Sequence, residues 1–154
     1  MDKYFDKLSV FIKENGVICE HVKFAQSCHS VAEAAAAVGG QTSDFVKNVC
    51  LEDEAGNIVV AIVKGEDHAS KQNAAQVAGV KKLRVASPER VLEKTGYPAG
   101  GTPSFGYSAK FLVDERVLEK ESVWTGGGSQ DALVKIAPSE MLKCNAGQVG
   151  RIRE

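Results

Sequence analysis

The stretch Ile58 to Val63 is apolar at every position and restricts the fold more than any other part of the sequence. Neighbouring side chains of a strand point to opposite faces, so this stretch would present a hydrophobic surface on both. Such a strand belongs inside a sheet that is covered on both sides. The β-rich run Phe45 to Glu52 precedes it, and residues 53–57 between the two are typical of a hairpin turn. We therefore expect a hairpin whose second strand is central.

Apolar periodicity and end signals predict the other elements. The capping box of Ser30 and Glu33 begins one helix, which Gly39 ends, and Ser87 followed by Pro88 begins another. The predicted helices cover 2–15, 30–39, 67–78, 87–95 and a short segment from 138, and further strands cover 17–24, 82–86, 111–113, 122–125, 133–136 and 149–153. This order favours an α/β (α+β) fold with a mixed, curved, barrel-like sheet and flanking helices over a doubly wound parallel sheet.

Length and charge limit the classes of function. A chain of 154 residues can bury one substantial core without metals or disulfides, so we expect a single domain over 1–154. No stretch approaches the ~20 apolar residues of a membrane span. The charged N-terminal segment also lacks the features of a signal peptide, so we expect a cytoplasmic protein with no membrane partner. Nineteen basic and twenty acidic residues give a net charge of −1, which means that any nucleic-acid contact must be local.

The cysteines and histidines do not form a metal-binding pattern. The four cysteines contain no CxxC pair and are expected to be reduced thiols. Cys19 with His21, and Cys28 with His29, lack the paired ligand spacing of a zinc site, so we expect no metal and no cofactor. The sequence also lacks a G-x-S-x-G elbow or other local nucleophile motif. Any hydrolysis must therefore use water or a group on the substrate.

Lys47 lies in the middle of the predicted strand over 45–52. Alternation places it on one face with the apolar Phe45 and Val49, and places Asn48 on the other face. Such a lysine either extends its amine from the sheet edge into solvent or is kept partly desolvated to present a cation to a ligand. The pattern alone does not separate these two interpretations.

The segment Thr95 to Gly106 contains four glycines and two prolines together with aromatic residues. The glycines would let backbone N–H groups approach an anion or a developing oxyanion, while the prolines would hold the loop rigid. A purely structural turn is the alternative. The loop matches neither the dinucleotide-binding GxGxxG nor the phosphate-binding GxxxxGK[ST], so a nucleotide hydrolase has no support. A second glycine run, residues 125–129, indicates a hairpin connection.

Four segments, in this order and spacing, resemble the YbaK/prolyl-tRNA-synthetase-associated domain family. They are Phe45 to Asn48, Thr95 to Gly106, Phe111 to Asp114 and Val123 to Gly127, within a resemblance that extends over 17–141. The resemblance implies a free-standing domain with a mixed, barrel-like sheet. It also implies hydrolysis of the ester of mischarged tRNA that carries a small amino acid such as Ala, Ser, Cys or Pro.

The resemblance assigns roles to particular residues. It implies catalytic roles for Lys47, Gly100 and Gly101. The lysine would anchor the terminal phosphate or ribose, and the glycine N–H groups would stabilise the tetrahedral oxyanion. The implied substrate-binding residues are Thr102, Pro103, Ser104, Phe105, Gly106, Asp114, Gly126 and Gly127. The loop departs from the family pattern, because proline stands at 103 and serine at 104, where many members have proline.

The implied partners are the acceptor end of tRNA and an aminoacyl-tRNA synthetase. Basic side chains available to the acceptor end are Lys71, Lys81, Lys82, Arg84, Arg90 and Lys110. The alternative function is a non-catalytic aminoacyl- or nucleotide-binding module that docks on a synthetase. The joint presence of Lys47 and the double glycine favours the enzyme, because docking requires neither.

Overall fold

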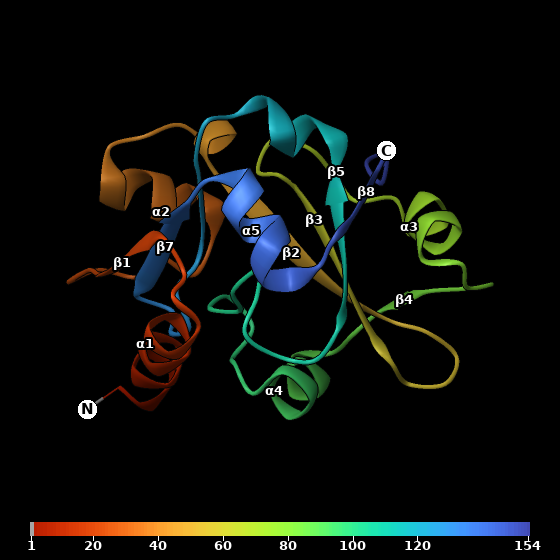
Figure 1. The fold of residues 1–154 in the computed structure, drawn as a ribbon, viewed down its shortest axis with the longest axis horizontal. Helices are drawn as coiled ribbons and strands as arrows, with labels where there is room; N and C mark the ends of the chain where they lie inside the picture. The colour runs from red at the N-terminus through yellow and green to blue at the C-terminus, as the bar shows by residue number, and fades with distance from the viewer. Residues whose placement is uncertain (1) are drawn as a thin grey trace.

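The computed structural model describes residues 2–154, and within them the helices flank two β-sheets (Figure 1). The α-helices are α1 (Lys3–Asn15), α2 (Val31–Val38), α3 (Lys71–Ala78), α4 (Pro88–Thr95) and α5 (Pro138–Asn145), and the short 3-10 helices are η1 (Thr42–Asp44) and η2 (Glu115–Glu119). The strands are β1 (Cys19–Lys23), β2 (Val46–Glu52), β3 (Ile58–Lys64), β4 (Arg84–Val85), β5 (Lys110–Asp114), β6 (Val123–Gly126), β7 (Ala132–Ile136) and β8 (Gln148–Gly150).

The larger sheet has five strands in the order β4-β2-β3-β5-β8 and is mixed. β2 and β3 form the predicted antiparallel hairpin, while β5 runs parallel to both β3 and β8. Every residue of β3 is buried, because Val60 and Ile62 face one apolar cluster and Val59 and Ala61 face another. The sequence prediction of a central strand that is covered on both faces is confirmed.

The smaller sheet has three antiparallel strands in the order β1-β7-β6. An isolated bridge between Phe45, just before β2, and Trp124 of β6 joins it to the larger sheet. The mixed sheet expected from the sequence is therefore present, but the strands do not close into a barrel. On its outer edge β2 pairs with β4 only at Leu51 and Glu52, and Ala86 N donates to Cys50 O at 3.0 Å, so no strand within residues 2–154 covers that edge at 47–49. This uncovered edge lies between the two sheets.

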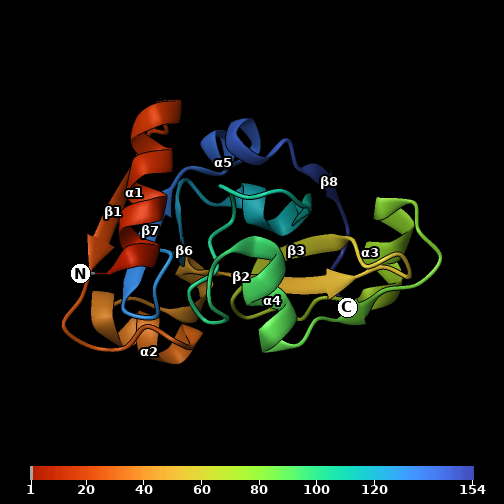
Figure 2. The ribbon, with the colours of Figure 1, turned by 90° about the horizontal axis from the view of Figure 1, so that it is seen from below.

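Three apolar clusters hold the layers together. The largest lies between the sheets and includes Leu8 of α1, Val91 of α4 and Met141 of α5. The second cluster packs the alanines of α3 against the other face of the larger sheet. The third packs α2 against Phe45 and the smaller sheet. Figure 2 shows α1 and α2 beside the smaller sheet and α3 at the opposite end of the molecule.

The structure corrects the ends of two predicted elements. The helix expected over 67–78 begins at Lys71, because the Ser70 side chain accepts a hydrogen bond from Asn73 N and Ala69 instead pairs with Arg153 near the C-terminus. The last strand spans Gln148–Gly150 rather than 149–153, since the following residues turn toward the carboxylate of Asp114. Across residues 2–154 no helix combines the length and apolar character needed to cross a membrane.

Candidate functional site

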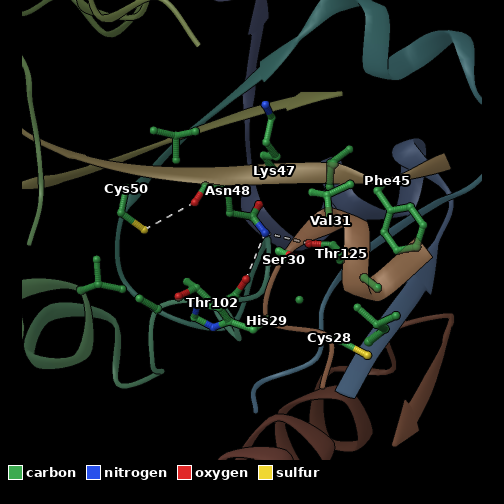
Figure 3. Close-up of a pocket in the computed structure, with 18 of the residues that line it drawn as sticks. Cys28, His29, Ser30, Val31, Phe45, Lys47, Asn48, Cys50, Thr102 and Thr125 are labelled. Atoms are coloured by element: carbon green, nitrogen blue, oxygen red, sulfur yellow. Dashed lines mark hydrogen bonds between the residues drawn. The ribbon is translucent and has the colours of Figure 1, made fainter. Parts of the chain in front are cut away.

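A cavity of about 490 Å³ opens beside the uncovered edge of β2 (Figure 3). Its wall is formed by β2, by the segment Cys28 to Val31 that leads into α2, by Ala99, Gly100 and Thr102 of the glycine-rich loop, and by the end of β6. Apolar side chains supply most of the lining, among them Val46, Ala34 and Leu133. The cavity therefore lies at the junction of the two sheets, where two loops meet the edge of β2 and the end of β6.

A polar network crosses one wall of this cavity and is centred on Asn48. The Asn48 amide nitrogen donates to the carbonyl oxygen of Thr102 at 3.0 Å and to Thr125 Oγ1 at 2.8 Å (Figure 3). The Ser104 hydroxyl donates to Asn48 Oδ1 at 2.7 Å and lies 2.7 Å from Thr125 Oγ1. Ser104 and Thr125 are almost fully buried, so each side chain satisfies a partner that water cannot reach. The network fixes β2, the glycine-rich loop and β6 relative to one another.

The glycine-rich loop makes a tight turn at the cavity wall. Gly101 N donates to the carbonyl oxygen of Pro98 at 3.0 Å, and Gly100 occupies the third position of this turn with φ 88°. That conformation requires glycine, because a side chain at positive φ is strained. The Thr102 hydroxyl also donates to the Pro98 carbonyl at 3.0 Å. The N–H of Gly101 is thus already bonded, whereas no hydrogen bond from the N–H of Gly100 is formed within residues 2–154.

The second glycine run packs directly against this loop. Gly128 N donates to Gly101 O at 2.8 Å, and a Cβ at Gly101 would lie 2.8 Å from Gly128 O. Gly126 is equally confined, since a Cβ there would lie 2.7 Å from the carbonyl carbon of Thr102. The run does connect β6 with β7, as predicted. It also serves as a close-packed support for the loop, which the sequence did not indicate.

The other predicted substrate-binding residues do not line the cavity. Phe105 is fully buried in the core, and Gly106 lies against Leu8 and Phe11 of α1. Pro103 is buried as well, and its carbonyl accepts a hydrogen bond from the Tyr107 hydroxyl at 2.6 Å. These three residues support the loop from the side of the protein core and do not contact the cavity.

Two further predicted substrate residues have structural partners. Gly127 donates from its N–H to Ala132 O at 3.0 Å, and its carbonyl lies 2.8 Å from His21 Nε2. Asp114 is fully buried, with Oδ1 accepting from the backbone of Ile152 and Arg153. This carboxylate anchors the C-terminal segment and is absent from the cavity lining.

Lys47 lies on the rim of the cavity. Figure 3 shows its side chain on the side of β2 opposite the Asn48 amide, with the amine directed away from that network. The side chain is half-buried and forms no ion pair within residues 2–154. The alternation predicted from the sequence is confirmed, and the lysine presents an uncompensated cation beside the cavity rather than inside it.

A family model described as "Aminoacyl-tRNA editing domain" matches residues 25–144. The chain belongs to the aminoacyl-tRNA editing domain family. It is similar to the protein YwhH of Bacillus subtilis (strain 168), with 25% identity over 139 residues that cover 89% of this chain and 85% of the relative. The resemblance inferred from the lysine and the glycine-rich loop is thereby confirmed at the level of the family.

Two other comparisons connect this editing domain with prolyl-tRNA synthetase. The proline–tRNA ligase of Geobacter metallireducens (strain ATCC 53774 / DSM 7210 / GS-15) is 30% identical over 103 residues, which cover 66% of this chain but only 18% of the ligase. A crystal structure of a proposed trans-editing enzyme for prolyl-tRNA synthetase superposes with a TM-score of 0.90 at 29% identity and covers 100% of this chain and 99% of that one. The likeness to the ligase is thus confined to a small part of it.

The ionisable groups of the editing-domain cavity are few. No Asp or Glu side chain from residues 2–154 lines it. Burial raises the pKa of the Cys50 thiol to about 11, and burial together with the charges of Asp131 and Glu33 raises the pKa of Cys28. Both thiols are therefore protonated near neutral pH and are poor nucleophiles. Residues 2–154 contain no group of three or more His, Cys, Asp or Glu side chains arranged to hold a metal ion.

The sequence analysis gave no substrate-binding or catalytic role to three residues of the cavity lining: Asn48, Thr125 and His29. Asn48 could have been recognised from the sequence, because it is a polar residue between Val46 and Cys50 on an otherwise apolar strand face. Thr125 and His29 lie in segments whose contacts with β2 depend on the tertiary fold. Local pattern could not place them.

The basic residues expected to meet tRNA fall into two groups. Arg84 and Arg90 both bind the buried carboxylate of Glu52, at 2.9 and 2.6 Å, and Lys110 donates to the Ala78 carbonyl at 2.7 Å. These cations hold β4, α4 and α3 in place. The remaining members of the set form no ion pair within the described part of the chain, and they are Lys71, Lys81 and Lys82.

Proposed function

We propose that this editing domain hydrolyses the ester bond of tRNA that has been charged with a small, incorrect amino acid. The observation that carries the proposal is the cavity of about 490 Å³ at the seam of the two sheets. Its walls are mostly apolar, its polar network is internally satisfied, and an unpaired cation lies on its rim. An aminoacyl group would enter the cavity while the nucleotide to which it is attached stays at the rim.

The rigidity of the walls supports selectivity for small side chains. The turn at Gly100 and the packing of Gly101 on Gly128 leave the loop little room to withdraw from a larger group. An apolar pocket gains only about 1–3 kcal/mol per methylene, so exclusion of bulk by fixed walls is the stronger source of discrimination. Alanyl, seryl, cysteinyl and prolyl esters are the substrates we expect.

The chemistry requires an attacking oxygen and stabilisation of the oxyanion. The protonated cavity thiols do not serve as nucleophiles, so water or the neighbouring ribose hydroxyl attacks the carbonyl carbon. The backbone N–H of Gly100 would donate to the resulting oxyanion, because that of Gly101 is occupied by the turn. A single donor of this kind contributes roughly 10²-fold or more in rate. Lys47 would hold the phosphate or ribose of the terminal nucleotide by charge.

The test is a panel of tRNAs charged with alanine, serine, cysteine, proline, leucine and phenylalanine, incubated with purified protein and followed for loss of the aminoacyl group. We expect hydrolysis of one or more of the small esters and at least about tenfold slower hydrolysis of the leucyl and phenylalanyl esters. Equal rates for small and aromatic esters would refute the selectivity. Tight binding of aminoacyl-tRNA without turnover would instead establish the non-catalytic module that docks on a synthetase.

A further inference from the structure

We propose that His29 is the proton-transferring residue of this site, a role that rests on the deacylase function proposed above. His29 precedes the Ser30 N-cap of α2 and lines the mouth of the cavity next to Gly100. Its ring lies so close to Gly100 that a Cβ at that glycine would be 2.7 Å from His29 Cε1. The imidazole therefore lies beside the residue whose N–H is available to the oxyanion.

Local contacts fix the backbone that carries His29 but leave its ring free. The His29 N–H donates to Ser27 Oγ at 3.2 Å, and Ser30 Oγ accepts from Glu33 N at 3.2 Å at the start of α2. No hydrogen bond of either ring nitrogen is formed within residues 2–154, and the residue is exposed. The ring is therefore not held by another group of residues 2–154, and Nδ1 is its atom nearest to Gly100, so a nitrogen able to transfer a proton lies beside the loop.

The other ionisable groups of the cavity cannot take this role. The lining contains no carboxylate, and the thiols of Cys28 and Cys50 keep their protons at neutral pH. The Lys47 amine points away from the Asn48 network (Figure 3). Imidazole can both accept and donate a proton, and His29 is the sole imidazole of the lining within residues 2–154.

The step balances without a cofactor. A neutral ring nitrogen of His29 removes a proton from water as the water oxygen bonds to the ester carbonyl carbon. The tetrahedral oxyanion then collapses, the bond between that carbon and the ribose oxygen breaks, and the imidazolium returns its proton to the ribose oxygen. The products are the free amino acid and the ribose hydroxyl, and the histidine is regenerated.

The charges near His29 come from α2 and from the loop between β6 and β7. Glu33 of α2 lies within hydrogen-bonding distance of Ser27 Oγ and Ser30 Oγ, and Asp131 acts electrostatically on the adjacent Cys28. The glycine-rich loop over 96–106 carries no charged side chain.

The test compares the wild type with His29→Gln, His29→Ala and the matched control His68→Gln, which alters a histidine outside the cavity lining. With the best ester of the tRNA panel, we expect His29→Gln to lower kcat about 100-fold or more with little change in KM. The wild-type kcat should fall as pH is lowered and imidazolium forms, and this dependence should vanish in His29→Gln. Added imidazole should restore part of the rate of His29→Ala, because the site is open to solvent.

The outcomes separate this proposal from the function on which it rests. Suppose that the wild type hydrolyses the ester and that His29→Gln does so at a rate within about threefold and with the same pH profile. This result would overturn the role of His29 but would still support the deacylase function. Failure of the wild type on every ester would overturn both. Equal thermal melting of all four proteins is expected, since the His29 ring forms no hydrogen bond. A lower rate that tracks a lower melting temperature, without imidazole rescue, would identify His29 as structural.

Discussion

The side chain of Asn48 should stabilise the fold well beyond an ordinary surface amide, and Asn48→Ala tests this. The amide group takes part in hydrogen bonds to Thr102 O, Thr125 Oγ1 and Ser104 Oγ at 3.0, 2.8 and 2.7 Å. Ser104 and Thr125 keep their mutual contact in the variant, so the main loss falls on the Thr102 carbonyl. An unpaired buried acceptor costs about 1–3 kcal/mol, and each other lost bond about 1 kcal/mol.

We therefore expect Asn48→Ala to lower the free energy of unfolding by about 3–5 kcal/mol, or the melting temperature by roughly 6–20 °C for a chain of this size. Urea titration followed by circular dichroism measures the first quantity, and calorimetry measures the second. The matched control is Asn15→Ala, which removes an exposed amide that bonds to Phe11 O at the end of α1. Its effect should stay within about 0.5 kcal/mol.

A loss below about 1 kcal/mol for Asn48→Ala, indistinguishable from that of Asn15→Ala, would refute the reasoning. It would mean that water replaces the lost amide and that the cavity wall is wetter than the burial of Ser104 indicates. Deacylation by Asn48→Ala should also fall, because the loop that carries Gly100 loses its link to β2. Activity preserved at reduced stability would show that the network supports the fold and not the site.

The remaining predictions concern the rim, the loop, His21 of β1 and metal dependence. Lys47→Ala should abolish most deacylation with an unchanged thermal melt, and an unfolded variant or full activity would each contradict the cationic role. Gly101→Val should reduce both activity and stability, the latter by about 2 kcal/mol, since the new side chain meets the backbone of Gly128 and Ser129 at 2.8 Å; wild-type melting would disprove the contact. Burial lowers the pKa of His21 below 6.5, so its contribution to stability is complete above pH 6.5 and declines as pH falls through the lowered pKa. Urea titrations from pH 7.5 to 5 should show this decline, and His21→Gln should lack that part of it. Chelation by EDTA should leave deacylation unchanged, and a loss that zinc restores would revive a metal site.

Elements that depend on local sequence could be predicted well. The caps at Ser30 and Ser87 accept hydrogen bonds from Glu33 N and Arg90 N, as their spacing indicates, and the helices after them end at Gly39 and Gly96. These signals lie within one turn of the chain, so tertiary structure cannot easily override them. The predicted start of α3 was wrong because Ala69 forms an isolated β-bridge with Arg153, which lies more than eighty residues further along the chain.

The site was predicted only in part for a related reason. Lys47 and the double glycine are recognisable because each is an unusual residue for its local pattern. The wall that they share depends on Asn48 meeting Thr102 and Thr125, which lie 54 and 77 positions further along the chain. For Asp114 the prediction was of substrate binding, because the residue follows a strand that resembles the family. In the structure its carboxylate instead accepts hydrogen bonds from the backbone N–H groups of Arg116, Ile152 and Arg153. The spacing of residues in a sequence does not show which polar groups have hydrogen-bond partners in the fold.

The bridge between Phe45 and Trp124 has a consequence for how the site can be observed. Trp124 is the sole tryptophan of the sequence, its ring stacks 6.4 Å from that of Phe45, and the amine of Lys135 lies 5.7 Å from its centre. Because Phe45 also lines the cavity, a ligand that displaces it alters the surroundings of this one indole. The intrinsic fluorescence of the unlabelled protein therefore reports on the seam between the sheets, and under the proposed function stopped-flow emission would time the entry of an aminoacyl group separately from its hydrolysis.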